Sequence, residues 1–103
     1  MKTQVLVTYA TKHGSTAEIA TKIGEVISEM GFVVDVLDVN QAVDLSNYTA
    51  VVVGSSIYFG DWHNKMVDFL ELNQEILHEK DVWIFSSGPT GMRDEYELSL
   101  IHI

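Results

Sequence analysis

The sequence predicts one α/β domain, built on an open parallel sheet with helices on both faces. Strand-like and helix-like apolar patterns alternate along its 103 residues, as in strand–helix–strand units. The predicted strands are continuous apolar runs, which is typical of strands buried on both faces. Segments rich in Gly, Ser and Thr follow three of these strands. Together these observations indicate a parallel sheet with a polar edge.

The first half of the chain contains two predicted strands and the helix between them. Residues 4–9 form a short β-branched strand. A helix is predicted to begin at Ser15 and to end before Gly31, the residue type that follows many helices. Residues 32–39 form the second strand. The apolar residues of the helix recur at spacings of three and four, namely Ile19, Ile23, Val26, Ile27 and Met30.

The second strand is predicted at the edge of the sheet, because Asp35 and Asp38 interrupt its apolar run. Carboxylates on an edge strand reach water and discourage pairing with other chains.

The polar segment that follows the second strand contains Leu45 and Tyr48 as the expected anchors to the core. A third strand at residues 50–54 comes next in the chain.

A second helix is predicted over about residues 63–77 and a fourth strand over residues 82–85. The carboxyl ends of parallel strands meet at one edge of the sheet, where ligands of such folds bind. We therefore expect three segments to meet there: residues 8–16, 54–62 and 86–91.

The first of these segments has the composition of a phosphate site. It carries hydroxyls at Thr11, Ser15 and Thr16, and Gly14 allows close approach of the backbone. Free N–H groups at the start of the following helix attract phosphate. The alternative is a tight turn with a helix cap and no ligand. The sequence motifs of P-loop NTPases and of the dinucleotide-binding fold are absent from the sequence.

The second segment carries Tyr58, Phe59 and Trp62 among small residues. Aromatic faces stack on flat conjugated rings, and small residues let backbone amides reach ring heteroatoms. The alternative is a satellite core under a long loop. Residues 86–91 are placed to form a second border of the same ring.

These segments resemble the flavodoxin-like superfamily. Residues 11–16 resemble its phosphate loop, and residues 54–62 and 86–91 resemble its two flavin-ring loops. The spellings Tyr-x-Thr-x-x-Gly-Ser-Thr, Gly-Ser-x-Ile-Tyr-x-Gly-x-Trp-His and Phe-Ser-Ser-Gly-Pro-Thr-Gly resemble the branch that contains menaquinone-dependent protoporphyrinogen oxidases. The resemblance implies sheet order 2-1-3-4-5, with FMN at the switch between the first and third strands.

The resemblance also implies which residues bind FMN. It assigns no catalytic residue, and the sequence has no Cys and no paired His spacing typical of metal sites. The implied FMN-binding residues are Thr11, Lys12, His13, Gly14, Ser15, Thr16, Ser56, Ile57, Tyr58, Phe59, Gly60, Trp62, Ser87, Gly88, Pro89, Thr90 and Gly91.

The end of the chain departs from this family pattern. The chain has room for four strands, so we expect the fifth strand and last helix of the family to be missing. Residues 1–103 are expected to form a single domain that is truncated at its C-terminus, with residues 95–103 as a tail outside the family. The fourth strand would then be an open edge through which the chain self-associates.

Composition limits the partners of this domain. Six Lys and Arg oppose fifteen Asp and Glu, which gives a net charge of −9 and disfavours nucleic acid and anionic membranes. No apolar run approaches the length of a transmembrane segment, and a cytoplasmic protein is expected.

Three functions remain open at this stage. The first is an FMN-binding electron-transfer domain that serves a redox partner protein. The second is an FMN-dependent oxidoreductase of the protoporphyrinogen-oxidase type that passes electrons to a small molecule such as a quinone. The third is a fragment that keeps the α/β core without usable flavin binding.

Overall fold

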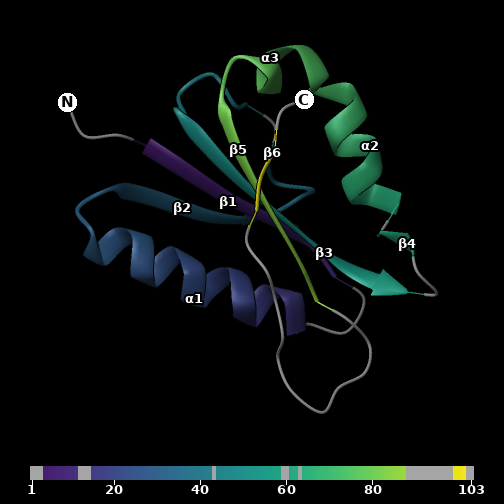
Figure 1. Cartoon of the computed structure of the whole chain (residues 1–103), viewed down its shortest axis with the longest axis horizontal. Helices are drawn as coiled ribbons and strands as arrows, with labels where there is room; N and C mark the ends of the chain where they lie inside the picture. The colour runs from purple at the N-terminus through teal and green to yellow at the C-terminus, as the bar shows by residue number, and fades with distance from the viewer. Residues whose placement is uncertain are drawn as a thin grey trace.

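Four parallel strands form the sheet in the order β2-β1-β3-β5 (Figure 1). The predicted open parallel sheet is therefore confirmed, and the acidic second strand lies at its edge as expected. The parallel strands are β1 (Gln4–Ala10), β2 (Val33–Asp38), β3 (Ala50–Tyr58) and β5 (Asp81–Ser87). The computed structural model describes residues 4–11, 15–42, 44–58, 61, 62, 64–87 and 99–101.

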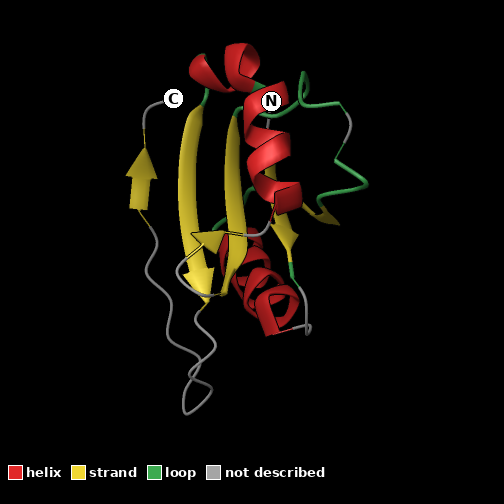
Figure 2. Ribbon diagram, turned by 90° about the vertical axis from the view of Figure 1, so that its right-hand side faces the viewer, coloured by secondary structure: helices red, strands yellow, loops and turns green. Residues whose placement is uncertain are grey.

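Helices cover both faces of the sheet (Figure 2). Helix α1 (Ser15–Glu29) lies on one face, and α2 (Asn64–Leu72) and α3 (Gln74–His78) lie on the other. Gly31 has φ +101° just beyond α1, which confirms its predicted place after the helix. Gly24 lets α1 approach β2, since a Cβ there would lie 2.5 Å from the Val36 side chain.

The central strands are buried on both faces, as their continuous apolar sequences predicted. Leu6 and Ala10 of β1 pack towards α2 and α3, whereas Val5 and Val7 pack towards α1. The same division continues across β3 and β5. Helix α1 covers Val52 and Phe85, and α2 and α3 cover Val51, Val53 and Val82.

The second predicted helix is interrupted at Asn73, between α2 and α3. The Asn73 backbone N–H donates to the Phe69 carbonyl at 3.1 Å, and its side-chain Nδ2 donates to the same oxygen at 2.8 Å. Asn competes in this way for backbone groups and disfavours a helix interior. The prediction of one continuous helix was therefore wrong at this residue.

A short antiparallel strand, β6 (Ser99–Ile101), pairs with Val82–Ile84 of β5. The prediction that this edge is open is wrong for these residues. An antiparallel neighbour needs no crossover helix, so the chain can return beside β5 without the long connection that a fifth parallel strand requires. Self-association through the rest of this edge stays a prediction.

A polar tether joins edge strand β2 to the segment that precedes β3. The Tyr48 hydroxyl donates to Asp35 Oδ2 at 2.6 Å, and the Lys80 ammonium donates to the Tyr48 carbonyl. Leu45 is buried beside it, so the two predicted anchors, Leu45 and Tyr48, are confirmed. Burial, followed by the hydrogen bond to Asp35 and by its charge, raises the pKa of Tyr48 to about 12.

This tether predicts a loss of stability at high pH. An unfolded Tyr ionises near pH 10, whereas Tyr48 keeps its proton in the fold up to about pH 12. Its contribution to the free energy of unfolding is therefore complete below about pH 10 and is lost as the pH rises through 12. Urea unfolding between pH 8 and 12 should show that the free energy of unfolding falls more steeply with pH in the native chain than in Tyr48→Phe. Parallel curves would contradict the assignment.

Candidate functional site

The carboxyl ends of β1, β3 and β5 lie side by side at one edge of the sheet, which we call the rim. Ala10 of β1 is in register with Ser55 of β3, and Ser55 with Ser86 of β5. Ser56 and Ser87 form the next pair outward. The convergence of the three predicted segments is thus confirmed for the strand residues within them, and small side chains occupy the rim.

The row of residues just inside the rim explains why β3 carries a glycine there. Gly54 lies between Tyr9 of β1 and Phe85 of β5. A Cβ on Gly54 would overlap the Phe85 ring, which is itself buried. The Phe85 ring thus packs directly on Gly54, in the row of residues next to the rim.

Hydroxyl groups from three elements lie at or near the rim. Thr11, half-buried, directly follows β1, and Thr16 is fully buried in the first turn of α1. Ser55 is also fully buried and donates from Oγ to the Ser56 carbonyl at 3.0 Å. The start of α1 reaches the same edge of the sheet in Figure 1, so its first-turn N–H groups lie near these hydroxyls.

Thr8 differs from these residues. Its side chain is fully buried two residues before the end of β1, and its hydroxyl has no hydrogen-bond partner among the residues that the structure describes. Thr8 faces α2 and α3, as do its neighbours Leu6 and Ala10. The Thr8 side chain therefore packs in the core, and its hydroxyl does not lie at the rim.

The aromatic segment begins as a hairpin at the end of β3. Strand β4 (Asp61–Trp62) turns back on β3, with Trp62 opposite Ile57 and Asp61 opposite Tyr58. The sequence predicted a loop here instead of a strand. A signal was present, because two residues ending in Gly60 connect the strands, and Gly is typical of hairpin turns.

The remaining predicted site residues fall into two groups. For Ser15, Ile57, Tyr58, Trp62 and Ser87 the structure describes the backbone within a helix or strand. The others lie outside the described residues: Lys12, His13, Gly14, Phe59, Gly60, Gly88, Pro89, Thr90 and Gly91.

Two findings limit other kinds of site. In the described ranges, no group of three or more His, Cys, Asp or Glu side chains is arranged to hold a metal ion. None of the helices described is long and apolar enough to cross a bilayer.

Comparison with known proteins identifies the family. Residues 6–100 match the flavodoxin domain. The chain belongs to this family. The match includes part of segment 95–103, whose assignment as a tail stays a prediction.

Among curated relatives, the protoporphyrinogen IX dehydrogenase [quinone] of Escherichia coli K12 is 34% identical over 97 residues. The alignment covers 92% of this chain and 52% of that enzyme, so the chain spans about half the length of the curated relatives it matches.

Solved flavodoxins share the fold. An archaeal flavodoxin is 24% identical with a TM-score of 0.76, and the match covers 85% of this chain and 64% of that one. A Fusobacterium nucleatum flavodoxin bound to flavin mononucleotide is 22% identical with a TM-score of 0.69, over 85% and 53% of the two chains. Both matches confirm the flavodoxin-like arrangement of strands and helices.

The packing below the rim predicts the effect of a single methyl group. Gly54→Ala should lower the free energy of unfolding by about 1–3 kcal/mol, the usual cost of overpacking a core. In a Phe85→Leu background the same change should cost less, because the smaller side chain leaves room. Urea unfolding of the four proteins measures this coupling. An equal cost in both backgrounds would show that Phe85 does not set the limit.

Proposed function

We propose that this chain binds FMN at the rim and acts as an electron-transfer domain. The observation that carries the proposal is the register of Ala10, Ser55 and Ser86, which brings three strand ends together beside the start of α1. Family membership supports the same function, because the flavodoxin neighbours include one with flavin mononucleotide bound.

The groups at the first part of the rim fit a phosphate. A phosphate needs hydrogen-bond donors more than it needs cations when a helix N-terminus faces it. The hydroxyls of Thr11 and Thr16 and the first N–H groups of α1 are such donors, and Lys12, His13, Gly14 and Ser15 complete the proposed loop. The net charge of −9 makes this local donor set necessary for anion binding.

The groups at the second part of the rim fit a flat ring. Ser56 and Ser86 have small, half-buried side chains that leave room for a ligand, and the β3–β4 hairpin carries aromatic residues to the same edge. We propose that Ser56 to Gly60 and Trp62 border one side of the ring and that Ser87 to Gly91 border the other. Bound FMN supplies the electron chemistry, and these residues orient it and exclude water.

The acidic protein also influences the electron affinity of the flavin. Negative charge around the ring disfavours an anionic reduced form, by the same physics that raises the pKa of a carboxyl beside another carboxylate. We therefore propose that the potential of the bound flavin lies below that of free FMN. As an electron carrier, the domain would pass electrons to a redox partner protein.

A second candidate function is an FMN-dependent oxidoreductase that delivers electrons to a quinone. The 34% identity to the Escherichia coli protoporphyrinogen IX dehydrogenase [quinone] favours it, although the chain spans about half of that enzyme. Quinone reduction by the FMN-loaded chain with a porphyrinogen as donor separates this function from that of a carrier. A chain that retains no flavin on purification and binds none on titration would fit the third function, a fragment without usable flavin affinity.

The phosphate assignment predicts a difference between two flavins. Thr11→Ala should weaken FMN binding roughly 10- to 100-fold, since a hydrogen bond to a charged group contributes about 1.5–3 kcal/mol. Binding of riboflavin, which has no phosphate, should change little. Thr16→Ala should behave alike, with urea unfolding measured in parallel because Thr16 is buried.

Thr21→Ala is the matched control. Thr21 lies on the same helix, is exposed, and donates from its hydroxyl to the Ala17 carbonyl at 2.9 Å. It should leave both affinities unchanged. Equal losses of FMN and riboflavin affinity in Thr11→Ala would refute the phosphate assignment.

The ring assignment predicts which tryptophan reports binding. The chain has two Trp residues: Trp62 in the β3–β4 hairpin and Trp83 in β5, three residues before Ser86. FMN should quench the protein fluorescence, and Trp62→Phe should remove most of that quench while Trp83→Phe keeps it. If the quench disappeared in Trp83→Phe instead, the ring would lie elsewhere.

A further inference from the structure

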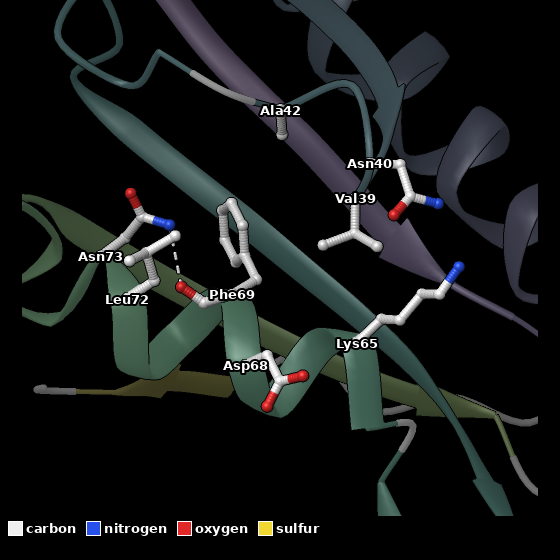
Figure 3. A pocket seen from close by; sticks show the side chains of 8 residues that line it. All are labelled: Val39, Asn40, Ala42, Lys65, Asp68, Phe69, Leu72 and Asn73. Atoms are coloured by element: carbon white, nitrogen blue, oxygen red, sulfur yellow. Dashed lines mark hydrogen bonds between the residues drawn. The ribbon is translucent and has the colours of Figure 1, made fainter.

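An open hollow of about 420 Å³ lies between α2 and the turn after β2. Its floor is apolar, because Val39, Ala42 and Phe69 meet there and are at most 8% exposed. Figure 3 shows Phe69 in the middle, with Leu72 towards one end and Lys65 towards the other. We call this hollow the α2 groove, and the residues that define it are Val39, Ala42, Lys65, Asp68, Phe69 and Leu72.

Leu72 is the unusual residue of the α2 groove. Its side chain is 86% exposed, more than any other large hydrophobic residue in the described part of the chain. It lies one turn after Phe69 at the end of α2. The hydrogen bond from Asn73 Nδ2 to the Phe69 carbonyl, at 2.8 Å, fixes this end of the helix. Leu72 is therefore held in water next to an apolar floor, and covering it would be favourable.

Exposed acidic side chains lie on α2 and α3, and one of them, Asp68, lines the α2 groove together with Lys65. Asp68 and Glu71 on α2 and Glu75 on α3 are all exposed, and Lys65 is the one basic residue in the α2 sequence. The whole chain carries −9. Such a surface attracts basic groups and repels nucleic acid, anionic lipid and a second copy of this acidic chain.

We propose that the α2 groove docks a basic amphipathic helix of a partner protein. The apolar face of that helix packs on Phe69 and Leu72, and its Lys or Arg side chains lie beside Asp68 and Glu71. Apolar grooves that run along a helix accept partner helices in this way, through anchors spaced by three or four residues. The proposal goes beyond the redox function and needs no flavin, because the groove residues belong to α2 and to the turn after β2.

The test uses the flavin-free chain and a fluorescein-labelled synthetic helix with Leu at positions i, i+3, i+4 and i+7 and Lys elsewhere. Fluorescence anisotropy should show saturable binding that weakens with added salt. Leu72→Ser should weaken it about tenfold, the effect of losing about 1.4 kcal/mol of apolar contact. The double change Asp68→Asn with Glu71→Gln should weaken binding at low salt and reduce its dependence on salt.

Met30→Ser is the matched control, because Met30 is 69% exposed and directly follows α1, which covers the opposite face of the sheet. It should leave the affinity unchanged. Several results would overturn the proposal: no saturable binding, equal effects of Leu72→Ser and Met30→Ser, or equal binding of a peptide with the same composition in scrambled order. Preference for phosphatidylserine vesicles over the peptide would overturn it in favour of a membrane. Dimerisation that Leu72→Ser abolishes would assign the groove to a second copy.

Discussion

The burial of β1 and β3 on both faces is the constraint on which the rest of this structure depends. A strand covered on both sides needs helices above and below the sheet, and the chain supplies them through crossovers between parallel strands. Parallel strands in turn place all their carboxyl ends at one edge. The apolar runs that form the core therefore also determine where the rim lies, whatever residues occupy it.

Side-chain size then determines what the rim can accept. Phe85 packs against Gly54 just inside the rim. At the rim itself Ala10 and Ser55 are buried, whereas Ser86 is half-buried. Among the described residues of the rim, the half-buried Thr11, Ser56 and Ser86 are thus open to a ligand. In a chain with net charge −9, the proposed anionic cofactor would have to be held by oriented donors at short range, because the field of the whole chain is unfavourable to it at long range.

The sequence was sufficient to predict the features that depend on local pattern. The four parallel strands, the edge position of Asp35 and Asp38, the end of α1 before Gly31 and the meeting of three strand ends at the rim all follow from apolar period and turn chemistry. The break at Asn73 was missed because the apolar period continues through it. Strand β6 was missed because three residues give no periodic signal.

Contacts between distant parts of the chain were beyond sequence reasoning. The Tyr48 hydroxyl and Asp35 are 13 residues apart, and Lys80 is 32 residues from the Tyr48 carbonyl it contacts. The α2 groove likewise joins a turn and a helix that are separated in sequence. Its exposed Leu72 fits the apolar period of a helix, so only the structure distinguishes it from a core residue.

The most direct test of the account is an NMR map of the isotope-labelled chain titrated with FMN. FMN should shift the amide signals mainly at residues 10–16, 55–62 and 86–91 and should leave those of the α2 groove unchanged. A folded chain whose amide shifts do not respond to FMN, or respond mainly at α2 and the turn after β2, would contradict the rim as the flavin site.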